Sequence, residues 1–259
     1  MKDETINDNM ENKDYLLIAG QNNEPEIFYT LEGEMPLMGR PSVFLRMSGC
    51  NLRCPAFKSP DSPYGCDSYV SWSKKNKRSF EEVLDIMNTQ GFTERLKKGA
   101  ILKLTGGETT IHQDTLIRFV EWFETRAGFE LVIDIETNAT IQPLEDWSQF
   151  GTTFTTSPKL ASNGDPEDKR YKPEVLKWHI EYGSAFKFVV QNEGDIDEID
   201  KKYVQALGMP KRNIWLMPCC GSRQEHLDKA TQVAEWAKQF DVGFSPRMHL
   251  LLWNKALLV

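Results

Sequence analysis

Three of the chain's five cysteines lie within 17 residues, at Cys50, Cys54 and Cys66. They follow the apolar segment 42–47, which we expect to be a buried strand, so the three thiols belong to one loop at a strand end. Such a loop can hold a metal ion or an iron–sulfur cluster. A structural zinc ion normally takes four protein ligands, whereas a 4Fe-4S cluster held by three cysteines leaves one iron open to a second molecule.

Other interpretations of these cysteines compete with a cluster. A disulfide is disfavoured because three is an odd number and the polar, acidic segment 1–14 does not resemble a signal peptide. Buried, unreactive cysteines are common, but this loop is rich in Pro, Asp, Ser and Lys. A zinc site would need a distant fourth ligand, such as Cys219, Cys220 or a histidine. The spacing alone leaves the cluster and the zinc ion open.

The composition narrows the class of protein. The chain has 259 residues, of which 40% are hydrophobic, and a formal net charge of -7. This charge argues against general binding to nucleic acids, and no apolar stretch approaches the roughly 20 residues that span a bilayer. We expect a cytoplasmic protein with a flexible tail over residues 1–14 and a single domain over residues 15–259.

Apolar segments alternate with segments of helical spacing along most of the chain. This order predicts right-handed βαβ units and a parallel sheet. Six main strands are fewer than the eight of a complete barrel, so we expect an α/β fold with a partial, open βα barrel. The expected parallel strands start near Ser42, Ala100, Glu130, Thr152, Ala185 and Asn213, with helices over 79–89, 113–126, 173–181, 196–207 and 227–240. We also expect a solvated loop at 74–78 and a last strand at 248–253.

Polar, turn-rich segments follow most of these strands. In parallel α/β folds the carboxyl ends of the strands share one edge, where chemistry gathers. The segments are 48–50, 105–109, 136–140, 157–159 and 217–221. We therefore expect a single active site at that edge.

Gly106 and Gly107 would let the backbone approach a ligand closely, and Glu108 adds a carboxylate. Such a group can hold an ammonium. The alternative is a tight turn that places Glu108 at a helix N-terminus, where the helix dipole favours a negative charge. Beside three clustered thiols, the ligand-binding interpretation is favoured.

Seven motifs occur in an order that matches one family. They span 26–34, 39–46, 49–54, 66–68, 104–108, 135–138 and 157–160. Together they resemble the 7-carboxy-7-deazaguanine synthase family of radical S-adenosylmethionine (SAM) enzymes, from Glu26 to near the C-terminus. The gap between Cys54 and Cys66 is longer than is usual in that family, so Cys66 is assigned from the Asp67 and Ser68 that follow it.

The resemblance implies a role for each matching residue. The 4Fe-4S cluster would be bound by Cys50, Cys54 and Cys66, and Mg²⁺ by Ser68. SAM would be bound by Gly65, Asp67, Gly107, Glu108, Ser157, Pro158, Lys159, Met217, Pro218, Cys219 and Cys220. The substrate, 6-carboxy-5,6,7,8-tetrahydropterin, would be bound by Leu31, Glu32, Gly33, Arg46 and Thr105.

The resemblance also implies a reaction. The reduced cluster would pass one electron to SAM, and the 5′-deoxyadenosyl radical would take a hydrogen atom from C6 of the pterin. The ring would then contract with loss of ammonia, giving the precursor of 7-deazaguanine nucleosides in tRNA or DNA. Flavodoxin or ferredoxin would supply the electron, and the resemblance allows a homodimer. Alternatives are another radical SAM enzyme, such as a glycyl-radical activase, or a non-catalytic zinc-binding module.

Two further side chains have positions that could bring them to the site. His249 lies with Arg247 on the expected last strand and could face the substrate. Lys187, on the fifth expected strand, could point into the barrel. We expect instead that its ammonium reaches solvent while its stem stays buried.

Overall fold

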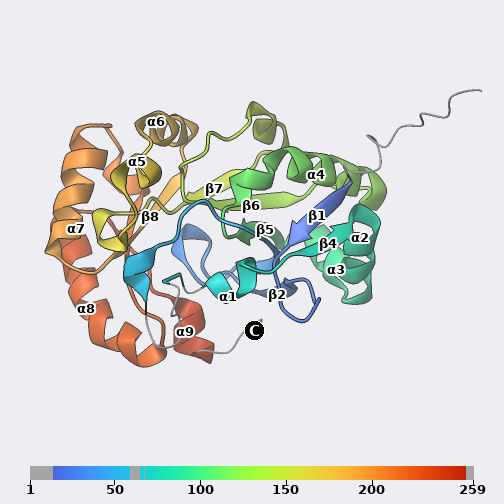
Figure 1. Ribbon diagram of the computed structural model, residues 1–259, viewed down its shortest axis with the longest axis horizontal. Helices are drawn as coiled ribbons and strands as arrows, with labels where there is room; N and C mark the ends of the chain where they lie inside the picture. The colour runs from blue at the N-terminus through green and yellow to red at the C-terminus, as the bar shows by residue number, and fades with distance from the viewer. Residues whose placement is uncertain (1–13, 59–64, 67, 255–259) are drawn as a thin grey trace, which may run out of the picture.

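The computed structural model describes residues 14–58, 65–66 and 68–254, and in these ranges the strands form one open sheet (Figure 1). Along the sheet the strand order is β10-β9-β8-β7-β6-β5-β3-β1-β4, and β2 pairs with β3. The strands are β1 (Tyr15–Ile18), β2 (Ile27–Leu31), β3 (Pro41–Met47), β4 (Asn76–Ser79), β5 (Ile101–Gly106), β6 (Val132–Thr137), β7 (Thr153–Thr156), β8 (Ala185–Val190), β9 (Ile214–Pro218) and β10 (Gly243–Phe244).

The part of the sheet from β3 to β10 is parallel throughout, and β1, β2 and β4 pair antiparallel. The six expected parallel strands are confirmed as β3 and β5–β9, and the short β10 extends them. Their carboxyl ends therefore share one edge, as the strand-end motifs required. The division into a tail and a single domain stays a prediction, since residues 1–13 lie outside the described residues.

Helices surround the sheet, with α2–α4 at one end and α7 and α8 at the other (Figure 1). They are α1 (Tyr69–Trp72), α2 (Phe80–Thr89), α3 (Phe92–Lys97), α4 (Gln113–Ala127), α5 (Glu167–Arg170), α6 (Pro173–Tyr182), α7 (Glu193–Glu198), α8 (Arg223–Phe240) and α9 (Met248–Trp253). A π-helical segment, Ile199–Gln205, continues α7. Single 3-10 turns occur at Met35–Leu37, Pro55–Phe57, Thr109–His112, Ala161–Asn163 and Lys211–Asn213, with a longer one at Glu145–Phe150.

Apolar side chains on one face of the sheet pack against these helices. Leu102 and Leu104 of β5 belong to a core cluster shared with α2, α3 and α4, and Phe186 and Phe188 of β8 belong to a second cluster with α8. Because successive strand residues point to opposite faces, the residues between them must point to the other face. There the strands carry polar and charged residues, and that face forms the interior of the partial barrel.

Two segments differ from the sequence predictions. Residues 248–253 form helix α9, not a strand, because a short apolar run has no periodicity that separates the two states. The basic run 74–78 is not a solvated loop throughout, since Asn76–Ser79 forms β4 and pairs with β1. The Asn76 side chain is buried and donates to the Gly20 carbonyl at 3.2 Å, which fixes this edge strand.

Candidate active site

The cysteine loop is joined to the end of β5 by backbone contacts. The Gly107 N–H donates to the Met47 carbonyl at 3.2 Å, and the Glu108 N–H donates to the Gly49 carbonyl at 2.9 Å. A Cβ at position 107 would lie 2.0 Å from the Gly49 oxygen and 2.8 Å from the Cβ of Cys50. Only glycine permits this approach. The Gly-Gly-Glu turn therefore lies directly against the first cysteine.

Each of the three predicted cluster cysteines accepts a hydrogen bond at its sulfur. The donors are Leu52 N–H to Cys50 at 3.5 Å, Asn163 Nδ2 to Cys54 at 3.4 Å and Trp72 Nε1 to Cys66 at 3.5 Å. Hydrogen bonds to sulfur stabilise negative charge on a thiolate and influence the reduction potential of an iron–sulfur centre. The loop thus provides a donor for each sulfur.

The three thiols and Lys159 share one electrostatic environment. Burial raises the pKa of Cys50 to about 11 and that of Cys54 to about 12. At both sites the charge of Cys66 raises the pKa further, and the Lys159 ammonium lowers it. Thiols in this state need added positive charge to ionise, and a bound cluster would provide it.

The loop returns to the first two cysteines at Gly65. This residue has a φ of +105°, and a Cβ there would lie 2.4 Å from the Cys54 carbonyl oxygen. Glycine is therefore required for Cys66 to come back beside Cys54. Ser68, the predicted Mg²⁺ ligand, precedes α1 and accepts the Trp72 N–H at its carbonyl. Asp67, predicted to contact SAM, lies outside the described residues.

Glu108 connects the ends of β5 and β6. Its side chain is buried, and its carboxylate accepts four hydrogen bonds from within the chain. The donors are Thr110 N–H at 3.1 Å, Thr110 Oγ1 at 2.6 Å, Thr137 Oγ1 at 2.6 Å and Asn138 N–H at 2.7 Å. With these partners Glu108 braces two strand ends, which holds the Gly-Gly-Glu turn in place.

The remaining residues predicted to bind SAM lie at the carboxyl ends of β7 and β9. Lys159 donates to both the carbonyl and the hydroxyl oxygen of Ser157 at 2.8 Å, which closes a tight turn around Pro158. Met217 and Pro218 end β9, and the Cys219 N–H donates to the Val190 carbonyl at the end of β8. The sulfur of Cys220 lies 3.5 Å from Nδ1 of His226.

Lys103 forms the centre of a charged cluster inside the barrel. Its side chain is 2% exposed, and its Nζ lies 2.5 Å from Asp134, 2.9 Å from Glu32 and 3.7 Å from Glu136. The contact with Oε2 of Glu32 is an ion pair whose alignment falls outside hydrogen-bond geometry. Burial lowers the pKa of Lys103, but the three carboxylates outweigh it and raise this pKa well above its usual value.

Glu136 is the carboxylate of this cluster that is most open to solvent, with 28% of its side chain exposed. Its Oε2 accepts the Thr105 hydroxyl at 2.5 Å, and its Oε1 lies 3.4 Å from Nζ of Lys187. Burial would raise the pKa of Glu136, but Lys187 and Lys103 hold it below its usual value. Glu136 is therefore an ionised acceptor at the opening of the barrel.

The prediction that the Lys187 ammonium reaches solvent is wrong. Its side chain is 10% exposed and its ammonium contacts both Glu34 and Glu136. The sequence favoured a solvent-exposed ammonium because neither partner is close to Lys187 along the chain. Burial would raise the pKa of Glu34, but Lys187, Arg247 and His249 outweigh it and lower this pKa to about 2.

Arg46, predicted to grip the substrate carboxylate, is oriented by Glu26. The Nε of Arg46 lies 2.6 Å from Oε2 of Glu26, and the Arg46 side chain is 20% exposed. Its charge also lowers the pKa of Glu136. Arg46 thus lies beside the interior cluster and is held through Nε.

The C-terminal segment packs on the predicted substrate loop Leu31–Gly33. The Met248 N–H donates to the Gly33 carbonyl at 2.9 Å, and a Cβ at Gly33 would lie 2.5 Å from Nδ1 of His249. Arg247 pairs with Glu34, Nε to Oε1, at 3.2 Å. The predicted strand at this position is wrong, but the helix brings His249 to the loop that the sequence prediction associated with substrate.

The sequence predictions assign no site role to Glu34, Lys103, Asp134 or Glu136. These four residues belong to the interior charges together with Lys187 and Arg247. Alternation was the signal that could have found most of them. Lys103, Asp134 and Lys187 each lie between apolar residues of a strand whose other face is buried, so their side chains must point into the barrel. Glu136 lies two residues after Asp134 and shares its face.

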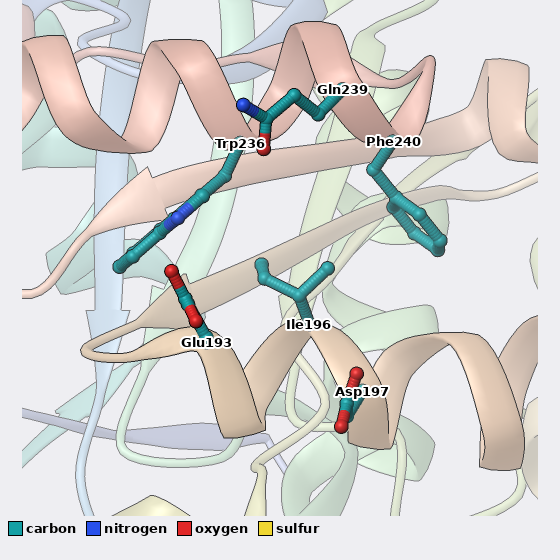
Figure 2. Close-up of a pocket in the computed structure, with 6 residues that line it drawn as sticks. All are labelled: Glu193, Ile196, Asp197, Trp236, Gln239 and Phe240. Atoms are coloured by element: carbon teal, nitrogen blue, oxygen red, sulfur yellow. The ribbon is translucent and has the colours of Figure 1, made fainter.

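A groove also lies outside this site, between α7 and α8 (Figure 2). Ile196, Trp236 and Phe240 contribute its apolar surface, and Glu193 and Asp197 lie along α7. Asp197 pairs with Lys201 of the same helical segment at 3.7 Å, and Lys211 lies 4.1 Å from the centroid of the Phe240 ring. The groove belongs to the outer helical layer and its lining contains none of the predicted site residues. We therefore place the chemistry at the strand ends.

Comparison with known proteins identifies the family of this chain. The chain is 30% identical over 234 residues to the 7-carboxy-7-deazaguanine synthase of Hyperthermus butylicus, covering 88% of this chain and 91% of that protein. The chain belongs to the 7-carboxy-7-deazaguanine synthase family. The synthase of Pyrobaculum aerophilum is 28% identical over 239 residues, covering 89% of this chain and 94% of the relative.

The fold agrees with the 7-carboxy-7-deazaguanine synthase assignment. The crystal structure of QueE from Escherichia coli superposes with a TM-score of 0.60 at 24% identity, covering 86% of this chain and 92% of the other. This similarity shows a shared partial-barrel fold. No protein-family model matches the chain. None of the helices in the described part has the length and apolar content needed to cross a bilayer.

Proposed function

We propose that this chain converts 6-carboxy-5,6,7,8-tetrahydropterin to 7-carboxy-7-deazaguanine, with ring contraction and loss of ammonia. The observation that carries the proposal is the pairing of two features at one sheet edge. Three hydrogen-bonded thiols lie on a loop whose first cysteine meets a glycine turn, and a charged interior that can bind a small polar molecule lies near the ends of the same strands. Membership of the synthase family supports the same reaction.

The donor set suits a 4Fe-4S cluster, because three thiols can hold it and leave one iron open, whereas a structural zinc ion normally takes four protein ligands. Cys50, Cys54 and Cys66 would hold the cluster, which with bound SAM would supply the radical that starts the reaction.

The chain's own groups would orient the two small molecules. The SAM methionine end would meet the open backbone at Gly107, and its other contacts would come from the turns after β7 and β9. The pyrimidinone ring of a pterin offers adjacent N–H groups. The ionised, partly exposed carboxylate of Glu136, held by the Thr105 hydroxyl, could accept hydrogen bonds from them. Arg46, held by Glu26, would face the substrate carboxylate.

The remaining partners follow from the reaction. Ser68 would contribute a hydroxyl oxygen to Mg²⁺, a cation that prefers oxygen ligands. Flavodoxin or ferredoxin would reduce the cluster, and the chain would act in the cytoplasm, where thiols stay reduced. A homodimer is compatible with every contact described for the site.

Product formation tests the proposed function. The chain, reconstituted anaerobically with iron and sulfide, is incubated with the carboxytetrahydropterin, SAM, Mg²⁺ and a reductant. We expect 7-carboxy-7-deazaguanine and ammonia in equal amounts. Product should be lost in Cys50→Ala, Cys54→Ala and Cys66→Ala. Reductive cleavage of SAM without deazaguanine product would contradict the assigned substrate and leave a radical SAM enzyme of another kind.

A further inference from the structure

Lys103 is a buried cation with no direct place in the proposed chemistry. Only 1% of the residue is exposed, and its ammonium lies among carboxylates from two elements, β6 and the turn after β2. Burying a charge is costly unless it is paired. The arrangement therefore raises the question of which carboxylate depends on Lys103.

The three carboxylates differ in the kind of partners they have besides Lys103. Asp134 accepts hydroxyl groups from Thr153 at 2.7 Å and Thr155 at 3.3 Å. Glu136 has Lys187 and Thr105. Oε2 of Glu32 is buried and faces Lys103 without any aligned hydrogen bond. The contact between Lys103 and Glu32 is therefore one of charge.

Glu32 in turn shapes the predicted substrate loop. Its Oε1 accepts the backbone N–H groups of Gly33 at 2.9 Å and Glu34 at 3.3 Å. Burial raises the pKa of Glu32, the charges of Glu136 and Glu34 raise it further, and Lys103 opposes them. An ionised Glu32 is the stronger acceptor for these N–H groups. The charge state of Glu32 therefore sets how strongly it holds the backbone that would contact the pterin.

We propose that Lys103 is a positioning residue for the pterin site: its ammonium holds Glu32 ionised against the backbone of the loop Leu31–Gly33 and orients Glu136 at the barrel opening. One buried cation thereby links the two sides of the substrate site. This inference rests on the proposed function, because it concerns how the same site binds its pterin.

Three variants test the link: Lys103→Met, Glu32→Gln, and the two combined. For Lys103→Met we expect the KM for the pterin to rise about tenfold, a normal coupling for neighbouring charges, with a smaller change in kcat. The KM should also become pH-dependent, increasing as the pH falls, because a buried Glu32 that has lost its cation takes up a proton more readily. A merely structural lysine would not produce this pH profile.

The combined variant removes one charge of each sign and should restore much of the binding. We expect a pH-independent KM close to that of Glu32→Gln, which should be raised above that of the unaltered chain but less than in Lys103→Met, because the neutral amide is a weaker acceptor of the same shape. Lys98→Met, which removes an exposed lysine at the end of α3, is the matched control. Its KM for the pterin should equal that of the unaltered chain at every pH. Iron content and SAM cleavage by a chemical reductant check that each variant is folded, since the cysteine loop does not contact Lys103 through any described hydrogen bond or ion pair.

The outcomes separate this proposal from the proposed function. If the unaltered chain makes no deazaguanine, the assigned reaction fails. If it does, but Lys103→Met keeps an unchanged, pH-independent KM, the role of Lys103 is overturned. A combined variant no better than Lys103→Met overturns the link through Glu32. Should Lys103→Met not load its cluster, Glu32→Gln decides: a raised KM with normal iron content supports the proposal, and an unchanged KM contradicts it.

Discussion

At the scale of single residues, Gly107 does the most to bring the parts of the site together. Its missing side chain lets the end of β5 touch the loop that carries Cys50. The contact is between backbone atoms, so no flexible side chain can move aside for a larger residue. The geometry of the cysteine loop therefore depends on this position.

We predict that Gly107→Ala prevents stable cluster loading. The new Cβ would meet the Gly49 carbonyl at 2.0 Å, so either the loop or the strand end must shift. The measurement is iron per chain after anaerobic reconstitution, together with the equilibrium affinity for SAM. Gly221→Ala is the matched control, since its nearest neighbour to an added Cβ is a side-chain atom of Glu225 at 3.9 Å. Normal iron content in Gly107→Ala would contradict this account of the turn.

The sequence singled out some residues of the candidate site and not others for a physical reason. Cysteines and paired glycines carry their chemistry in their identity, so their motif could be recognised. Lys187 carries no such signal, because its partner Glu34 lies 153 residues away. Only the fold brings them together, and the burial that turns these charges into a cluster is a property of the barrel interior.

At the scale of elements, α6 packs a buried histidine against strand β7. The His179 ring lies 5.3 Å from the Phe154 ring, centroid to centroid, and its Nδ1 is 2.9 Å from the Ser184 hydroxyl. Its Nε2 is buried without a hydrogen-bond partner in the described structure. Burial lowers the pKa of His179 to about 3. The neutral ring is therefore part of the folded state.

This predicts a pH dependence of stability. Between about pH 3 and 6.5 the unfolded chain binds a proton that folded His179 does not, so the free energy of unfolding falls as the pH drops through this window. From pH 7 to pH 5 the loss from this residue should be about 2 kcal/mol. The measurement is urea unfolding at both values for the unaltered chain and His179→Asn. An equal loss of stability in the two proteins would contradict the prediction.

The elements themselves were largely predictable from periodicity and caps. Helix α2 begins where a capping box was available, with the Glu82 N–H donating to the Ser79 hydroxyl and the Glu82 side chain accepting the Ser79 N–H. Helix α9 was not predictable, because a run of six mostly apolar residues fits a strand as well as a helix. Tertiary contacts decide that this segment is helical: Leu250 is buried, and the Met248 N–H donates a hydrogen bond to the Gly33 carbonyl.

At the scale of the whole molecule, one largely parallel sheet separates two kinds of environment. Its outer face packs apolar residues against helices, and its inner face holds paired charges. The strand order places the thiols, the glycine turn and this interior at one edge. The open barrel could be predicted because six strands alternate with helices, whereas the charge pairing inside it required the register of the strands, such as Lys103 opposite Asp134.

The central claim is that Cys50, Cys54 and Cys66 hold a cluster with one open iron, and counting iron and sulfide after oxygen-free reconstitution tests it most directly. The account predicts about four of each per chain, a brown protein whose absorbance near 400 nm changes on adding SAM, and loss of the cluster in Cys66→Ala. A colourless chain with one zinc ion, or an intact cluster in Cys66→Ala, would contradict it.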